Sequence, residues 1–237
     1  MIRFTDVYKT YPGGANALSN ISVEIADGAF VFLIGPSGAG KTTLLRLVIR
    51  DMLPTKGKVF VDDWEVSKLP KAQIHHLRRK VGMVFQDFKI LSDRTVFENV
   101  SLGLEILGKK ETDIQKDVSA VLELVGLANK ANRFPQELSA GELQRTSIAR
   151  AIAGGPKILL ADEPTGNLDP VTAREILDIL QEVNKIGTTI IMATHNVDVV
   201  NHFKKRTIAM ESGSIVSDEE KGHYRIERKA KKDYEST

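Results

Sequence analysis

The chain has 237 residues, of which 42% are hydrophobic and 27% are charged, a composition that is typical of folded globular proteins and excludes a disordered or fibrous class. Its length suits one large α/β domain, and no apolar run reaches the ~18 residues that a membrane-spanning helix needs. The formal net charge is only +2 and cysteine is absent, which excludes disulfides and thiolate zinc sites and fits the cytoplasm.

The N-terminal part of the chain predicts a β-rich lobe followed by a strand, a loop and a helix. Residues 2–11 and 20–28 alternate apolar and polar side chains, as half-buried antiparallel strands do, with the turn residues PGGAN between them. Residues 29–35, AFVFLIG, form a continuous apolar run that is typical of a buried central strand. A helical pattern over residues 41–52 follows a glycine-rich turn, and residues 57–66 predict a short hairpin.

The middle of the chain predicts an inserted helical subdomain. A polar helix near residues 71–80 and a second buried strand, VGMVF at 81–85, come first. From about residue 87 to residue 155 the pattern is helical and has no strand in it, with helices expected at 95–107, 113–126 and 141–154. We therefore predict a helical subdomain at about 87–155.

Strands and helices alternate again in the last part of the chain. The apolar segments KILLAD, TTIIMAT and RTIAMESGSIV begin at residues 157, 188 and 206, and helical patterns separate them. Because crossover helices connect parallel strands, we predict an α/β fold with a mainly parallel core sheet. We expect one domain over residues 1–220. Residues 221–237 carry six Lys and Arg against three Asp and Glu, and we interpret this basic tail as a solvated terminus.

A phosphate-binding loop follows the first buried strand. Gly35, Gly40, Lys41 and Thr42 match the pattern G-x-x-x-x-G-K-[ST] between a strand and a helix. Glycines let backbone N–H groups surround phosphate oxygens, the helix N-terminus attracts anions, and the lysine supplies a cation for the β- and γ-phosphates. We predict that the loop binds a nucleotide through Gly35, Pro36, Ser37, Gly38, Ala39, Gly40, Lys41, Thr42 and Thr43. The Thr42 hydroxyl is a predicted Mg²⁺ ligand.

Two carboxylates end a later buried strand, ILLADE. Asp162 suits a Mg²⁺ ligand, and Glu163 is placed to polarise the water that attacks the γ-phosphate. Such a pair is also typical of a solvated loop start, but its occurrence beside a phosphate-binding loop favours the catalytic interpretation. Gln86 and His195 each follow another buried strand. Since ligands of open α/β sheets bind at the carboxyl ends of the strands, we expect all these residues in one crevice.

These motifs together resemble those of the ATP-binding-cassette (ABC) family, over residues 1–216. The resemblance implies a P-loop ATPase of ABC type, with an antiparallel N-terminal lobe, which binds ATP and Mg²⁺. It implies that Tyr11 stacks on adenine, that Gln86 joins the lobes and senses Mg²⁺, and that His195 contacts the γ-phosphate. The residues Asn167 to Asp169, NLD, are similar to the D-loop of the family, which makes Asp169 a predicted nucleotide-site residue.

The stretch LSAGE, residues 138–142, resembles the family signature LSGGQ but has Ala140 and Glu142 at two positions. The resemblance implies a homodimer that forms on ATP binding, in which Ser139 and the N–H of Gly141 reach the γ-phosphate held by the other copy. Ser139 is also an ordinary helix N-cap residue. The added methyl of Ala140 lies beside the expected phosphate, so we expect slow turnover.

Within the family, the segments FQDFKILSDRTVFENV, DEPTGNLD and MATHN are most similar to the cassettes of bacterial cell division. That resemblance implies a peripheral protein at the cytoplasmic face of the membrane with an integral membrane partner, and no nucleic-acid partner. ATPases of lipoprotein-release and macrolide-type exporters share most of these motifs. A nucleotide-gated assembly module with little turnover is the alternative from another class of function.

Overall fold

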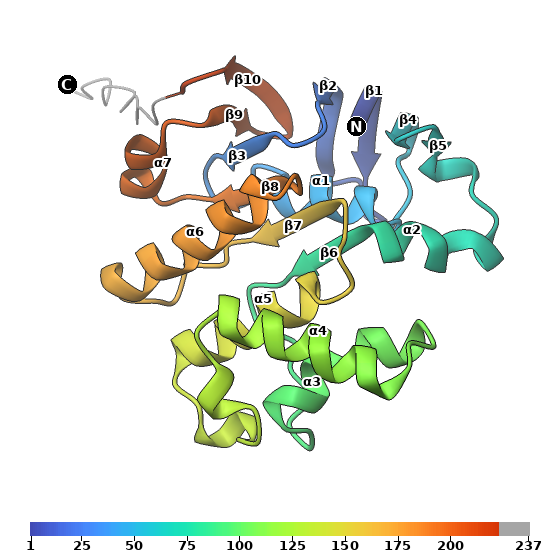
Figure 1. Ribbon diagram of the computed structural model, residues 1–237. Helices are drawn as coiled ribbons and strands as arrows, with labels where there is room; N and C mark the ends of the chain where they lie inside the picture. The colour runs from blue at the N-terminus through green and yellow to red at the C-terminus, as the bar shows by residue number, and fades with distance from the viewer. Residues whose placement is uncertain (223–237) are drawn as a thin grey trace.

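Two β-sheets form the frame of the structure, a computed structural model that describes residues 1–222, apart from the side chains of residues 197 and 198 (Figure 1). The first sheet is antiparallel, with the strand order β2-β1-β4-β5. Its strands are β1 (Ile2–Thr10), β2 (Asn16–Ile25), β4 (Lys56–Val61) and β5 (Trp64–Glu65). Ile2 and Phe4 of β1 are buried on one face, because alternate residues of a strand point to the same side. A register shift between Phe4 and Val7 places Val7 in the same cluster. The predicted antiparallel lobe is confirmed.

The second sheet is the core of the fold and has the strand order β10-β9-β3-β8-β7-β6. Its strands are β3 (Phe30–Ile34), β6 (Val81–Val84), β7 (Ile158–Asp162), β8 (Thr189–Thr194), β9 (Arg206–Glu211) and β10 (Ser214–Glu219). All neighbours are parallel except β9 and β10. Every residue of β3, β7 and β8 is buried, which explains their continuous apolar sequences. The mainly parallel core sheet is confirmed.

Each face of the core sheet has its own hydrophobic core. On one face, Val31 and Leu33 of β3 pack in a cluster with Leu44 and Leu45 of α1 (Lys41–Val48) and with the antiparallel lobe. The helix α2 (Ile74–Lys80) and the short 3-10 turns η1 (Val66–Lys68) and η2 (Lys71–Gln73) connect that lobe to β6.

Helix α1 ends at Val48, before the end of its helical sequence pattern, because Arg50 has a left-handed backbone with φ of 52°.

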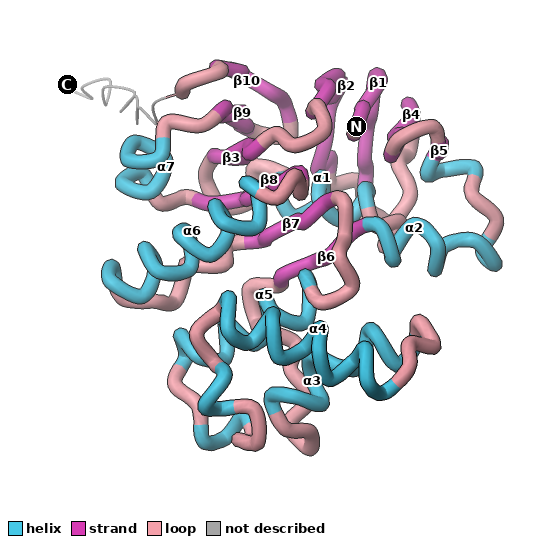
Figure 2. The backbone as a smooth tube through the Cα atoms, viewed as in Figure 1, coloured by secondary structure: helices cyan, strands magenta, loops and turns pink. Residues whose placement is uncertain are grey.

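Helices α6 (Pro170–Lys185) and α7 (Val197–Phe203) contribute to the core on the other face. The helices α3 (Val96–Ile106), α4 (Glu111–Leu124) and α5 (Ala140–Ile152), with the 3-10 turns η3 (Ala128–Lys130) and η4 (Pro135–Glu137), lie between β6 and β7 in the sequence. Figure 2 shows that this part of the chain contains helices and loops and no strand. Helix α5 packs against β6 and against α3, and α3 and α4 extend beyond it (Figure 1).

The domain boundaries stay predictions. The helical insertion is present, and its limits at about residues 87 and 155 rest on the sequence pattern. The predicted basic tail lies, from residue 223 on, outside the described residues. Among residues 1–222, no helix has both the length and the apolar character that crossing a bilayer requires.

Candidate active site

The carboxyl ends of four parallel strands bring the predicted residues to one edge of the core sheet. The loop at residues 35–40 follows β3, Asp162 ends β7, His195 follows β8, and Gln86 follows β6. Strand β8 pairs with both β3 and β7, and β7 pairs with β6. The shared edge is the place where open α/β sheets bind their ligands.

The glycines of the loop allow close backbone packing against neighbouring strands. Gly40 has φ of 102°, and a Cβ atom added there would lie 2.6 Å from the carbonyl oxygen of Ala17 in β2. Gly35 has φ of 148°, and a Cβ atom added there would collide with the carbonyl oxygen of Met210 in β9. Both positions therefore require glycine, which holds the loop directly before the N-terminus of α1.

The Lys41 side chain is folded into the loop that precedes it. It is only 5% exposed, and its Nζ donates hydrogen bonds to the carbonyl oxygens of Gly35 at 2.8 Å and Pro36 at 3.1 Å. The same Nζ lies 3.7 Å from Oε1 of Glu163. A fixed cation at the start of a helix is an arrangement that attracts phosphate.

Thr42 and Asp162 meet although they lie on different elements. The Thr42 hydroxyl donates to Oδ1 of Asp162 at 3.1 Å. Burial raises the pKa of the Asp162 carboxyl, and the negative charge of Glu163 raises it further, while the Thr42 hydrogen bond acts in the opposite direction. Hydroxyl and carboxylate oxygens are the ligands that Mg²⁺ uses, and this ion takes one or two protein groups together with substrate phosphates. The pair fits such a site.

Glu163 lies between two other predicted site residues. Its Oε2 is 2.8 Å from Nδ1 of His195, and its Oε1 faces Lys41. The Glu163 amide donates to the carbonyl oxygen of Ala193 in β8 at 2.9 Å, and the Glu163 backbone is left-handed with φ of 49°. A non-glycine residue in that conformation costs about 1–3 kcal/mol and is concentrated at functional sites.

Tyr11 and Gln86 lie at the border of this arrangement. The Tyr11 hydroxyl is 3.1 Å from Oγ1 of Thr43, in the first turn of α1, and the side chain is 36% exposed. Tyr11 is therefore attached to the phosphate-binding segment by its hydroxyl and has a partly free ring. Gln86 is exposed, two residues beyond the end of β6.

The LSAGE segment forms the start of α5. Ser139 is the N-cap residue: its hydroxyl accepts from the Glu142 amide, and the Glu142 carboxylate accepts from the Ser139 amide. These bonds hold the pKa of Glu142 below its ordinary value, the bond from the Ser139 amide most of all. In the described part of the chain, no hydrogen bond or ion pair joins the segment 138–142 to residues 35–43. Among the described residues, the two predicted phosphate-binding elements are thus not bonded to each other.

The start of α5 packs instead against the start of α6. A Cβ atom added to Gly141 would lie 2.5 Å from Cγ2 of Thr172. The hydroxyl of Thr172 donates to Asp169, the N-cap residue of α6, at 2.6 Å. This bond is the main cause of the lowered pKa of the Asp169 carboxyl. The signature therefore lies against the first turn of α6, and Thr172 in that turn is bonded to Asp169 of the D-loop. The sequence did not indicate this arrangement.

The sequence also did not indicate the backbone conformation and the hydrogen bonds of the segment after Gln86. Residues 87–95, which we call the connector, join β6 to α3. Phe88 and Lys89 both have left-handed backbones, with φ of 58° and 52°, and side chains of α5 bind their carbonyl groups. Neither residue is glycine or asparagine, so no residue type signalled this conformation.

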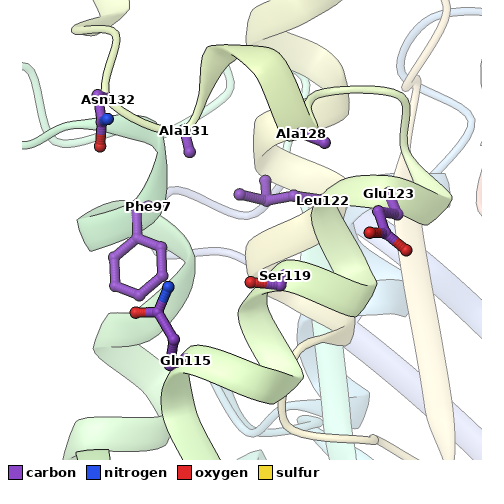
Figure 3. Close-up of a pocket in the computed structure, with 8 residues that line it drawn as sticks. All are labelled: Phe97, Gln115, Ser119, Leu122, Glu123, Ala128, Ala131 and Asn132. Carbon is purple, nitrogen blue, oxygen red and sulfur yellow. The ribbon is translucent and has the colours of Figure 1, made fainter.

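A separate pocket of about 390 Å³ lies within the helical insertion. Figure 3 shows the side chains around it, which come from α3, α4, the turn η3 and the loop after η3. Its lining residues are Phe97, Gln115, Ser119, Leu122, Glu123, Ala128, Ala131 and Asn132. None of them is a predicted site residue, so the pocket is not part of the candidate active site.

A phosphate-binding loop after a buried strand, with carboxylates at the end of a neighbouring parallel strand, defines a P-loop nucleoside triphosphatase. The sequence model of the family described as "ABC transporter" matches residues 18–166, and the chain belongs to this family of ATP-binding ATPases. It is 50% identical to the cell division ATP-binding protein FtsE of Bacillus subtilis, over 94% of this chain and 98% of that protein. Its identity to the FtsE protein of Escherichia coli is 43%, over 91% of this chain and 97% of that protein.

Solved structures agree with this assignment. The chain resembles the ATP-binding cassette MJ0796 in its dimeric structure, with a TM-score of 0.87 and 35% identity over 94% of this chain and 100% of that one. A second structure of MJ0796 is described as a dimeric post-hydrolysis state bound to ADP and Pi, with a TM-score of 0.86 and 34% identity over the same shares of the two chains. The predicted ABC-type ATPase fold and the predicted ATPase activity are confirmed.

Proposed function

We propose that this ATPase drives an integral membrane partner resembling FtsX in bacterial cell division and thereby regulates peptidoglycan hydrolysis across the membrane. It acts from the cytoplasmic face of the cell membrane as a peripheral protein. The cell-division role is supported by relatives named FtsE that match nearly the whole chain at 43–50% identity. The proposed catalytic roles are supported by two contacts at one sheet edge, that of Lys41 with Glu163 and that of Thr42 with Asp162. Lys41 is also bonded to the phosphate-binding loop.

In the proposed reaction the loop at 35–43 binds the phosphates of ATP, and Tyr11 stacks on adenine. Thr42, Asp162 and Gln86 are the residues that hold Mg²⁺, which when bound neutralises phosphate charge. Glu163 polarises the attacking water, and His195 contacts the γ-phosphate. Lys41 and His195, the present partners of the Glu163 carboxylate, are both assigned to the γ-phosphate. Arrival of that phosphate therefore releases the carboxylate to act on water.

We infer that the complete site contains two copies of the chain. Ser139 and Gly141 of one copy cover the γ-phosphate on Lys41 of the other, with Asp169 beside it. Among the described residues, no hydrogen bond or ion pair joins the segment 138–142 to residues 35–43, which supports this arrangement. The dimeric structures of MJ0796 support it too. An interface in which each copy offers the same two surfaces is isologous and closes at two copies.

The membrane partner is proposed to contact the connector and the start of α3. Val96 is buried and Phe97 packs against the core, so these two side chains contribute to the packing of the helical insertion. Leu91 is 39% exposed and Phe88 is half-buried, which leaves apolar surface on the connector. An exposed apolar surface of this kind fits a short amphipathic helix of the partner.

Two observations favour a second candidate function, a nucleotide-gated assembly module with little turnover. The carboxylate of Glu163 is held by His195 and Lys41, and Ala140 adds a methyl group at the exposed start of α5. An exporter ATPase of the lipoprotein-release or macrolide type is the alternative within the same class.

Phosphate release separates these candidates. Purified chain is measured with Mg-ATP, alone and with the FtsX-like protein in vesicles. Repeated turnover that the partner accelerates supports the proposed motor function, and a single turnover per site in both conditions supports the assembly module. Cells that lack the chain and fail to separate, while retaining lipoprotein release, distinguish the cell-division role from an exporter.

A further inference from the structure

The geometry points to Arg150 and Ser147 of α5 as positioning residues for ATP hydrolysis, which fix the backbone directly after Gln86. The inference rests on the proposed role of Gln86 at the γ-phosphate and Mg²⁺. It assigns a function to two residues that lie outside every motif of the nucleotide site.

Three hydrogen bonds carry the inference. The Arg150 guanidinium donates through Nη1 to the carbonyl oxygen of Lys89 at 2.7 Å and through Nη2 to that of Phe88 at 3.1 Å. The Ser147 hydroxyl donates to the same Phe88 carbonyl at 3.1 Å. The planar guanidinium binds two successive carbonyl groups at once, which fixes their direction more firmly than a single ammonium group can.

These bonds hold the backbone in a conformation that is unfavourable for its residues. Phe88 and Lys89 are left-handed in succession, and bulky side chains disfavour this conformation. Such a conformation persists only where the surroundings enforce it. The Lys89 amide also donates to the Asp87 carbonyl oxygen at 2.6 Å, so the turn is tight directly beside Gln86. Without Arg150, Gln86 would therefore sample several positions.

The far half of the connector is held by the helical insertion too. The Asn99 side chain, fully buried in α3, accepts from the Leu91 amide and donates to the carbonyl oxygens of Leu91, Arg94 and Thr95. Gln136 donates to the carbonyl oxygen of Ser92 at 2.8 Å. The connector is thus attached along its length to helices α3 and α5 and to the turn η4.

The same helix that carries Arg150 begins at Ser139. A displacement of α5, caused by engagement of Ser139 with nucleotide in the other copy, therefore moves the carbonyl groups of Phe88 and Lys89 and with them Gln86. Arg150 is the physical link between the signature of one site and the Gln86 position of the other site.

The test is a double-mutant cycle on steady-state ATP hydrolysis by the full chain. We expect Arg150→Ala and Gln86→Ala each to lower kcat by about tenfold, with the dissociation constant for ATP changed by less than about twofold, and the double variant to lose no more than either single variant. Arg150→Lys, which can bind one carbonyl group, should fall between the parent and Arg150→Ala. Ser147→Ala should have a smaller effect in the same direction.

Arg206→Ala is the matched control. Arg206 also donates to a backbone carbonyl, that of Glu24, and to Asp218, and it lies in β9, away from the connector. Its loss should lower the melting temperature and leave kcat unchanged. Thermal melting of each variant shows whether it folds, and Arg150→Lys keeps the test decisive if Arg150→Ala does not fold.

Three results would overturn the inference. The first is a folded Arg150→Ala variant with the kcat of the parent. If Arg150→Ala does not fold, the same result in Arg150→Lys counts in its place. The second is multiplication of the two losses in the double variant, which means that Arg150 acts independently of Gln86. The third is an unchanged kcat in Gln86→Ala, which removes the proposed role of Gln86 and the positioning role with it. In the first two cases the proposed role of Gln86 survives.

Discussion

Glu163 and His195 are in direct contact, with Oε2 of the carboxylate 2.8 Å from Nδ1 of the imidazole. The other carboxylate oxygen faces Lys41 at 3.7 Å, so the predicted base is held by the two groups that are assigned to the γ-phosphate. On the proposed roles, a γ-phosphate that binds Lys41 and His195 takes both partners from the Glu163 carboxylate and frees that carboxylate to polarise water.

The raised pKa of Asp162 leads to a prediction about stability. Because the folded-state pKa lies above the unfolded one, folding favours the protonated form, and the stability of the free chain falls as pH rises from the unfolded pKa through the folded pKa. Asp162→Asn keeps an acceptor for the Thr42 hydroxyl and removes the buried charge. We expect a melting temperature at pH 7 that is higher by ~2–4 °C, the shift that 1 kcal/mol gives in a chain of this size.

The same variant should lose Mg²⁺-dependent ATP hydrolysis. By scanning calorimetry without nucleotide, the excess of its melting temperature over that of the parent should be larger at pH 7 than at pH 4, because the Asp162 carboxyl of the parent is charged only at the higher pH. Asp117→Asn, which removes a partly exposed carboxylate of α4 that pairs with Lys109, is the control. A destabilised Asp162→Asn variant at pH 7 would contradict the assigned cause of the pKa shift.

Tyr11 combines two roles that substitutions can separate. Tyr11→Phe removes the hydroxyl that contacts Thr43 and should lower the free energy of unfolding by about 1 kcal/mol, with ATP affinity within about twofold of the parent. Tyr11→Ala also removes the ring and should weaken ATP binding at least several-fold, since stacking of a base on an aromatic ring is worth about 1–3 kcal/mol. Calorimetric titration with ATP measures the ATP affinity of both variants. Equal losses of affinity in the two variants would refute adenine stacking.

The contact of Gly141 with Thr172 predicts a compensating pair of substitutions. Gly141→Ala places a methyl group against Cγ2 of Thr172, which the bond to Asp169 holds in place. Overpacking of this kind costs about 1–3 kcal/mol. Thr172→Ser removes Cγ2 and keeps the hydroxyl, so the double variant should recover most of the lost stability in urea unfolding. If the double variant is no more stable than Gly141→Ala alone, Thr172 is not the obstacle.

The proposed partner surface predicts a change in membrane attachment. Leu91→Ser removes an exposed apolar side chain from the connector and leaves its backbone bonds to Asn99 in place. We expect the variant to keep its melting temperature and to sediment less with vesicles that contain the FtsX-like partner. Ile186→Ser, at a highly exposed residue between α6 and β8, should sediment as the parent does. Undiminished sedimentation of Leu91→Ser would place the contact elsewhere.

The parts of the site that follow local rules could be predicted from the sequence. The glycines, Lys41, Thr42, Asp162 and His195 each follow a buried apolar strand, and the parallel topology brings the ends of such strands together. The contacts between elements could not be predicted in this way. Arg150 and Asn99 are polar residues within helical patterns, and their binding of connector carbonyls depends on how α3 and α5 pack. Likewise, nothing in the residue types signals that Gly141 lies against Thr172.

In the proposed dimer, ATP joins two copies of the chain through Lys41 of one and Ser139 of the other. Glu163→Gln keeps the size of the side chain and removes the base, so bound ATP should persist, with kcat lowered by about 10²–10⁴-fold. Sedimentation velocity of this variant with saturating Mg-ATP measures the assembly directly. We predict a dimer that disappears without ATP and in the double variant Glu163→Gln with Ser139→Arg. A strictly monomeric Glu163→Gln variant, at high protein concentration with ATP bound, would contradict the ATP-joined dimer.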